Sequence, residues 1–125
     1  MKQHFCLISI GTNTNRVKNI KLAQELLSFN FPQIHLGKEM DTEPIGINNP
    51  AHFTNQLAMM QTKLSIEEIR QVLKNIEIQV GRIPEDKEKG IIKMDIDLLM
   101  YDSAILKVSD LKKEFIIAGL KEFGL

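Results

Sequence analysis

The sequence predicts an α+β fold of the ferredoxin-like type, a split β-α-β sandwich in which helices pack on one face of an antiparallel sheet. The first observation is the order of strand-like and helix-like segments, which runs β-α-β-β-α-β along the chain. The second is the length of 125 residues, which allows one domain with a core and is too short for two ordinary domains. We therefore expect a single domain over residues 1–125.

The first half of the chain predicts a strand, a helix and a second strand. An apolar, partly β-branched run over 5–10 ends at a glycine and predicts the first strand. Apolar residues recur at helical spacing over 17–27 and predict the first helix. A weaker alternating segment over 34–40 predicts the second strand. The Pro/Gly/Asn loop that follows over 41–50 is long enough to be typical of a binding loop.

The second half predicts the remaining strands and helices. An apolar run over 53–62 predicts the third strand. Ser65 and Glu68 have the spacing of a capping box, which predicts a helix that extends from there to about residue 80. A long polar loop, a fourth strand and a short terminal helix are predicted next, over 82–93, 94–101 and 111–123.

Composition excludes several classes of protein. Lys plus Arg and Asp plus Glu number 16 each, so no basic excess favours nucleic acid or an anionic membrane as a partner. The single cysteine, Cys6, lies in an apolar run and is expected to be a small core residue. No apolar run has the length of a membrane span or of a signal sequence. We expect a cytoplasmic protein that is a monomer or a weak dimer.

Two aspartates in the predicted fourth strand are the clearest chemical signal, because Asp95 and Asp97 interrupt an otherwise apolar run. Residues i and i+2 of a strand point to one face, roughly 7 Å apart, so the two carboxylates are expected to project together. Their repulsion and lost hydration call for an opposing charge such as a divalent cation. Mg²⁺ takes one or two carboxylates and completes its shell with water and phosphate oxygens, which indicates phosphoryl transfer. The alternatives are a solvated polar face on an edge strand, or an aspartate that bonds to a nearby turn.

Three weaker features accompany the aspartates. Phe53 and Asn55 share a strand face and suit a nucleobase-like or pterin ligand, although a core phenylalanine and a strand-end asparagine explain them equally well. Pro44 and Gly46 shape a loop that can present its backbone to a planar heterocycle, or form an ordinary turn. Glu77 lies late in the second predicted helix, where a solvated charge is the simpler interpretation.

In this order and spacing the segments resemble the 6-hydroxymethyl-7,8-dihydropterin pyrophosphokinase family, folate-pathway enzymes of ferredoxin-like architecture. The resemblance covers roughly residues 5–101. The matching segments are a turn after the first strand, the Pro/Gly loop, the start of the third strand, the end of the second helix and the aspartate pair: Ile10–Asn13, Thr42–Gly46, Phe53–Asn55, Glu77 with Gly81 and Arg82, and Asp95–Asp97.

The resemblance implies a Mg²⁺-dependent diphosphokinase, a transferase that moves pyrophosphate from ATP to 6-hydroxymethyl-7,8-dihydropterin. It implies that Asp95 and Asp97 hold two Mg²⁺ ions that bridge the phosphates of ATP, with Arg82 as a further catalytic residue. The pterin-binding residues that it implies are Thr42, Pro44, Ile45, Gly46, Phe53, Asn55 and Phe115. The residues that it implies for ATP are Glu77, Lys93 and Lys112, the two lysines as substitutes for arginines of the family.

The sequence departs from the family pattern where that family holds the triphosphate. The family's loop after the second helix is rich in arginine and carries a tryptophan, whereas loop 82–93 has four basic and three acidic residues and only one arginine, Arg82. The C-terminal segment also lacks the family's histidine and arginine. Two alternatives therefore stay open, a catalytically weak or inactive pterin- or nucleotide-binding relative, and a ferredoxin-like interaction module with solvated aspartates.

Overall fold

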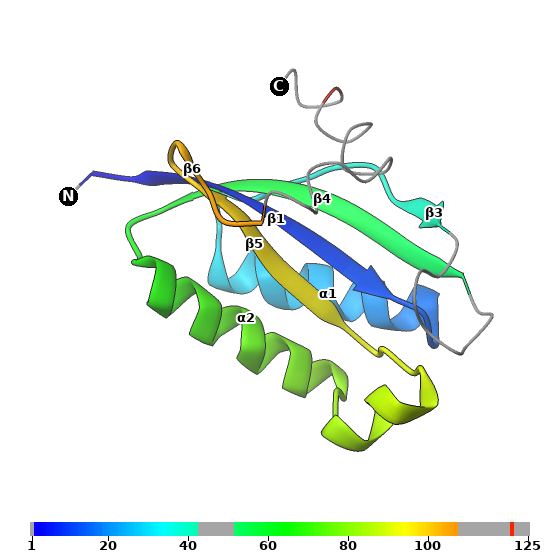
Figure 1. Ribbon diagram of the computed structural model, residues 1–125. Helices are drawn as coiled ribbons and strands as arrows, with labels where there is room; N and C mark the ends of the chain where they lie inside the picture. Colours follow the sequence, from blue (N-terminus) through cyan, green and yellow to red (C-terminus); the bar gives the residue numbers. More distant parts are fainter. Residues whose placement is uncertain (1, 43–51, 108–120, 122–125) are drawn as a thin grey trace.

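The structure, a computed structural model, describes residues 2–42, 52–107 and 121 (Figure 1). Its strands are β1 (His4–Thr12), β2 (His35–Leu36), β3 (Met40–Thr42), β4 (Phe53–Thr62), β5 (Asp95–Tyr101) and β6 (Ala104–Ile105). Its helices are α1 (Arg16–Asn30), α2 (Ile66–Val80) and the short 3-10 helix η1 (Pro84–Lys89). No helix among the described residues is long and apolar enough to cross a membrane.

The strands form one antiparallel sheet in the order β2-β4-β1-β5-β6, and β3 pairs with β4 beyond the end of β2. The central strand β1 therefore lies between β4 and β5. Both long helices cover the same face of the sheet, as Figure 1 shows. This arrangement confirms the predicted α+β fold of ferredoxin-like type.

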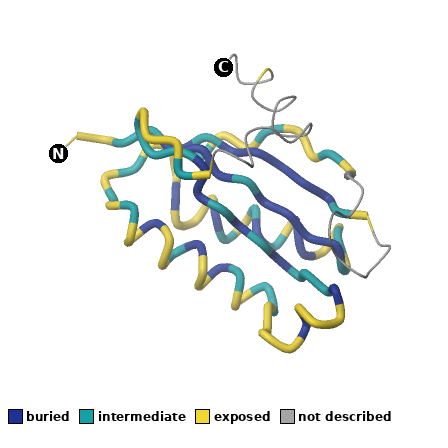
Figure 2. The backbone as a smooth tube through the Cα atoms, in the orientation of Figure 1, coloured by how far each residue is buried: buried dark blue, intermediate teal, exposed yellow. Residues whose placement is uncertain are grey.

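The main core lies between the helices and the sheet, where the buried positions follow the periodicity of each element (Figure 2). Every second residue of β1 contributes to it, and so does one stripe of each helix. These buried residues are Cys6, Ile8 and Ile10 from β1, Ile20, Ala23 and Leu27 from α1, and Ile69, Leu73 and Ile76 from α2. Cys6 is fully buried, which confirms its prediction as a core residue.

A second, smaller apolar cluster lies on the face of the sheet that the helices do not cover. Its fully or almost fully buried members are Leu7, Leu57 and Leu99. A β-bulge opposite Leu7 lets two successive residues of β5, Leu99 and Met100, pack on this face. The alternation before the bulge is regular, so the helix-free face also receives Asp95 and Asp97.

Two segments differ from the sequence prediction. The single strand expected over 34–40 is two short strands, because the register against β4 moves by one residue between β2 and β3, so that 37–39 bulge. Loop 82–93 is not wholly irregular, since η1 occupies its middle. The helix expected over 111–123 lies outside the described residues apart from position 121.

Candidate functional site

Asp95 and Asp97 lie at the start of β5, opposite Gly11 and Ser9 of the central strand. The residues between and after them face the helices, where Ile96 is 5% exposed and Leu98 is 3% exposed. The side chains of Asp95 and Asp97 keep 42% and 25% of their surface. The strand therefore presents two carboxylates on the helix-free face, as the alternation predicts.

Each carboxylate of this pair has a cation beside it. Arg82 Nη1 lies 3.2 Å from Asp95 Oδ1, and Lys107 Nζ lies 2.9 Å from Asp97 Oδ1. Burial and the charge of Asp97 raise the pKa of Asp95, and the guanidinium of Arg82 opposes that rise. The net direction is upward, with burial as the largest cause, so Arg82 and Lys107 do not fully offset the cost of keeping Asp95 charged.

Glu77 reaches from α2 to the outer edge of β5. Its Oε2 accepts a hydrogen bond from the backbone N–H of Ile96 at 2.8 Å, between the two aspartates, and lies 3.3 Å from Arg82 Nη1. Its side chain is only 14% exposed. Burial raises the pKa of Glu77, and the Ile96 N–H and the charge of Arg82 oppose that rise without cancelling it. The interpretation of Glu77 as a solvated charge is wrong, because its side chain is largely buried and bonded to β5. The sequence could not show this contact, since the partner residue is 19 positions away.

The end of α2 explains how Arg82 meets Glu77. Gly81 has φ of 122°, which favours glycine, and ends the helix with its N–H directed to the carbonyl of Glu77. The N–H of Arg82 also donates to that carbonyl at 3.0 Å, so the chain turns back toward β5. Arg82 then donates from Nη1 to the carbonyl of Met94 at 3.3 Å as well as to Asp95. This turn fixes the guanidinium beside the first aspartate.

A cleft of about 870 Å³ opens between α2, η1 and β5, and Asp95 and Asp97 form part of its wall. Besides these two, its charged lining residues are Arg70, Lys74, Glu77, Arg82, Lys87 and Lys107. Its apolar lining includes two exposed isoleucines, Ile78 and Ile83. A concave site with an apolar wall and clustered charges suits a ligand that has both a planar ring and an anionic part.

Asn55 and Phe53 lie across the sheet from the aspartates. Gly11 of β1 pairs with Asn55 on one side and with Asp95 on the other, so one band of the helix-free face joins all three strands. A Cβ on Gly11 would lie 3.0 Å from Asn55 Oδ1 and 3.7 Å from Phe53 Cδ1. A side chain at position 11 would therefore press on the asparagine amide, and Asn55 itself is only 7% exposed.

The turn after β1 holds the loop that leads into β5. Asn13 Nδ2 donates to the carbonyl of Gly90 at 2.8 Å, and Asn13 Oδ1 accepts from the N–H of Ile92 at 2.7 Å. The backbone N–H of Asn13 donates to Ile92 as well. From sequence this turn is nonspecific, yet in the structure the buried asparagine fixes the approach to Asp95.

The other predicted site residues are distributed as follows. Thr42 belongs to β3, where its backbone pairs with Phe53. Lys93 is not among the residues that line the cleft, and its ammonium lies 2.9 Å from Asp86 Oδ2 in an ion pair. Five predicted residues lie outside the described part of the chain: Pro44, Ile45, Gly46, Lys112 and Phe115.

Sequence reasoning missed four basic residues of the cleft, Arg70, Lys74, Lys87 and Lys107. Lys107 follows β6, and only the pairing of β6 with β5 brings it to Asp97. The sequence does carry a signal for Arg70 and Lys74. They are four residues apart and Glu77 follows three residues later, so all three lie along one stripe of α2.

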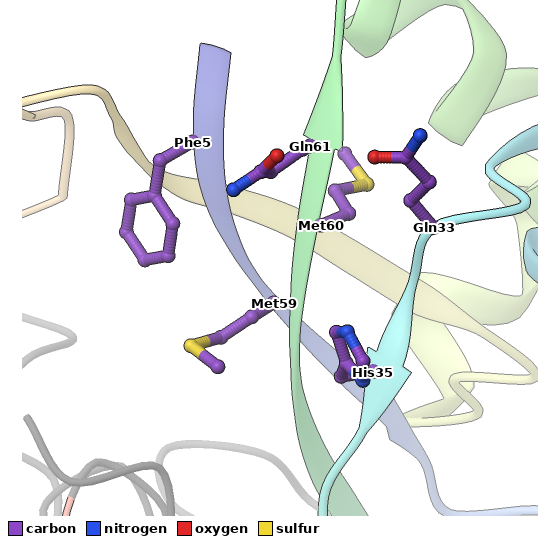
Figure 3. Close-up of a pocket in the computed structure, with 6 residues that line it drawn as sticks. All are labelled: Phe5, Gln33, His35, Met59, Met60 and Gln61. Atoms are coloured by element: carbon purple, nitrogen blue, oxygen red, sulfur yellow. The ribbon is translucent and has the colours of Figure 1, made fainter. Parts of the chain in front are cut away.

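A second cavity, of about 420 Å³, lies near the other end of β1 and β4 (Figure 3). It is lined by Phe5, Gln33, His35, Met59, Met60 and Gln61. None of the predicted site residues that the structure describes borders it. Its described lining has no carboxylate, lysine or arginine, whereas the first cleft holds the aspartate pair.

The aspartate pair fits a magnesium ion that is shared with a phosphate. No group of three or more His, Cys, Asp or Glu side chains among the described residues could hold a metal by itself. Two carboxylates on one strand face that both border the cleft, however, are the donor set that Mg²⁺ uses when water and phosphate oxygens complete its shell. The residues therefore fit a metal that arrives with a phosphorylated ligand.

Two solved structures give matches with low TM-scores. A de novo designed protein, Foldit4, matches with a TM-score of 0.42 and 10% identity, covering 79% of this chain and 98% of that one. The C-terminal domain of the MgtC protein from Mycobacterium tuberculosis also gives 0.42, with 11% identity over 77% of this chain and 86% of that one. Similarities of this size carry no functional information.

Sequence comparison is more specific. A curated protein from Arabidopsis thaliana named folate synthesis bifunctional protein is 31% identical over 97 residues, which cover 76% of this chain. The match spans 20% of that protein's length. The family model described as 7,8-dihydro-6-hydroxymethylpterin-pyrophosphokinase matches residues 7–124. The chain therefore belongs to the 7,8-dihydro-6-hydroxymethylpterin-pyrophosphokinase family.

Proposed function

We propose that this protein transfers a pyrophosphoryl group from ATP to the hydroxymethyl group of 6-hydroxymethyl-7,8-dihydropterin, a step of folate biosynthesis. The observation that carries the proposal is the position of Asp95 and Asp97. They lie between the charged cleft beside α2 and the band of the sheet that holds Asn55 and Phe53. Family membership supplies the identity of the two substrates.

The two sides of the aspartate pair receive different substrates in this proposal. The phosphates of ATP occupy the cleft. Asp95 and Asp97 would hold two Mg²⁺ ions, which would neutralise the negative charge of these phosphates. The pterin lies on the helix-free face, where Phe53 stacks on the ring and Asn55 bonds its amide-like edge. The loop from Thr42 through Pro44 and Ile45 to Gly46 lends backbone groups to the pterin, and Phe115 packs on its other face.

The reaction forms one bond and breaks one bond at the β-phosphorus of ATP. The hydroxymethyl oxygen attacks this atom, and the bond to the oxygen that bridges the α- and β-phosphates breaks. AMP leaves with the electron pair, and the hydroxyl proton passes to solvent. The protein contributes positioning and charge, with Arg82, which contacts Asp95, as a further catalytic cation.

AMP release tests the proposal directly. With ATP, Mg²⁺ and the dihydropterin, the wild-type chain should release AMP, and Asp95→Asn or Asp97→Asn should lower the rate about a hundredfold or more. Glu25→Gln is the matched control, because it removes one carboxylate charge from an exposed position on α1. Absence of AMP from the wild-type chain, or full activity in both aspartate variants, would reject the proposal.

One observation favours a second candidate, a relative that binds its ligands without efficient transfer. The only arginine of loop 82–93, Arg82, already contacts both Glu77 and Asp95, so its charge is shared before any phosphate binds. Calorimetry separates the two candidates. Binding of the pterin that is strengthened by a non-hydrolysable ATP analogue, without AMP release from ATP, would support the second. The single domain, the cytoplasmic location and the monomeric or weakly dimeric state stay predictions.

A further inference from the structure

We propose that Arg70 and Lys74 of α2 bind phosphate oxygens of the nucleotide and add to the charge of loop 82–93, whose Arg82 and Lys87 also line the cleft. This inference rests on the proposed function, because it assigns ATP to the cleft. It places the phosphate-binding cations on a rigid helix and not on a loop. Neither residue was expected to take part from the sequence.

The two side chains point into the cleft from one stripe of the helix. Residues four apart on a helix are neighbours, roughly 5–6 Å apart at Cβ, and both residues line the cleft with Glu77. Glu77 contacts β5 between the two aspartates. At a rise of about 1.5 Å per residue, Lys74 lies about 4.5 Å and Arg70 about 10 Å from Glu77 along the helix axis. The phosphate chain of a nucleotide that starts at the aspartates extends over a comparable distance.

The charges of Arg70 and Lys74 are available, whereas those of two other cleft cations are engaged. Arg82 contacts Glu77 and Asp95, and Lys107 contacts Asp97. Among the residues that the structure describes, Arg70 and Lys74 have no ion pair and no side-chain hydrogen bond. The fork of an arginine can bind two phosphate oxygens at once, and a lysine supplies a compact charge beside it.

The spacing of the two residues also has a cost that an anion removes. Like charges at positions i and i+4 of a helix repel each other and destabilise it. The nearest carboxylates of the same helix, Glu67 three residues before Arg70 and Glu77 three residues after Lys74, form no ion pair with either cation among the described residues. A bound phosphate relieves the repulsion between the cations, and the two cations offset the repulsion that Asp95 and Asp97 exert on the ligand from the opposite wall.

Titration of an unreactive nucleotide tests the inference without catalysis. We would titrate α,β-methylene-ATP with Mg²⁺ into wild-type protein, Arg70→Ala, Lys74→Ala and the double variant. Each single substitution should weaken binding about five- to tenfold, and the double variant should bind more weakly than either, with a smaller loss of affinity as salt rises. Lys21→Ala is the matched control, because it removes one exposed lysine from α1, outside the cleft.

The outcomes separate this inference from the proposed function. Wild-type affinity and salt dependence in the double variant would overturn the inference, and so would a wild-type chain that does not bind the analogue. Circular dichroism establishes that each variant is folded, and unchanged binding of the pterin alone shows that the remainder of the site is intact. Failure of AMP release by a wild-type chain that binds the analogue would reject the proposed transfer and leave this inference in place.

Discussion

The two faces of the sheet carry different kinds of residue in the same strands. The helix side of β1 and β5 is apolar and almost completely buried, with Ile8, Ile10 and Leu98 in one core. The other side of the same strands carries Ser9, Gly11 and the aspartate pair toward one end, where burial is incomplete. Burial of apolar side chains on the helix side stabilises the folded state. The polar groups on the other side remain accessible to a ligand, so the two faces serve different purposes.

The largest expected effect tests the helix side. Leu27→Ala removes a fully buried side chain of α1 and leaves a cavity, which should lower the free energy of unfolding by about 2–5 kcal/mol. Urea denaturation measures the change. Because Leu27 lies on α1 and does not line the cleft, the folded variant should keep wild-type affinity for α,β-methylene-ATP. A loss of affinity comparable to that of the Arg70 and Lys74 variants would show that the two faces are not independent.

An intermediate effect is expected at Gly11, on the helix-free face of the sheet. Gly11→Ala places a Cβ 3.0 Å from Asn55 Oδ1, so the amide must shift. The expected cost is about 1–3 kcal/mol of stability, and pterin binding should weaken more than nucleotide binding. Denaturation and separate titrations of the two ligands measure these effects. Ser9→Ala is the control, because Ser9 lies two residues before Gly11 on β1 and faces the same side of the sheet. Equal effects of the two variants would contradict the assigned role of Gly11.

The smallest effect concerns Asp95 in the absence of ligand. Its pKa is raised in the folded protein by burial first and by Asp97 second, so folding favours the protonated form. The free energy of unfolding should therefore fall as pH rises from the usual aspartate range through the folded pKa. Asp95→Asn should accordingly raise the Tm slightly at neutral pH and have little effect at acidic pH. A lower Tm at neutral pH would mean that the contact with Arg82 outweighs the repulsion.

The sequence predicted those elements whose signals are local. The strand expected over 53–62 is β4, and the capping box at Ser65 is present, with Ser65 Oγ accepting from the N–H of Glu68 at 3.2 Å. The position of Asp95 and Asp97 on one face was also predictable, because the alternation of side chains along a strand is a local property. The expected strand over 34–40 was wrong because its division depends on the register against β4, which a neighbouring strand sets.

The site divides in the same way. The sequence by itself determined the fold class, the aspartate pair and the family, because residue periodicity and motif spacing are properties of the chain. The tertiary structure alone decided that Glu77 bonds Ile96, that Lys107 faces Asp97, and that the cations of α2 line the cleft. Such contacts join residues on different elements, and their distances depend on how the elements pack, which no local pattern in the sequence encodes.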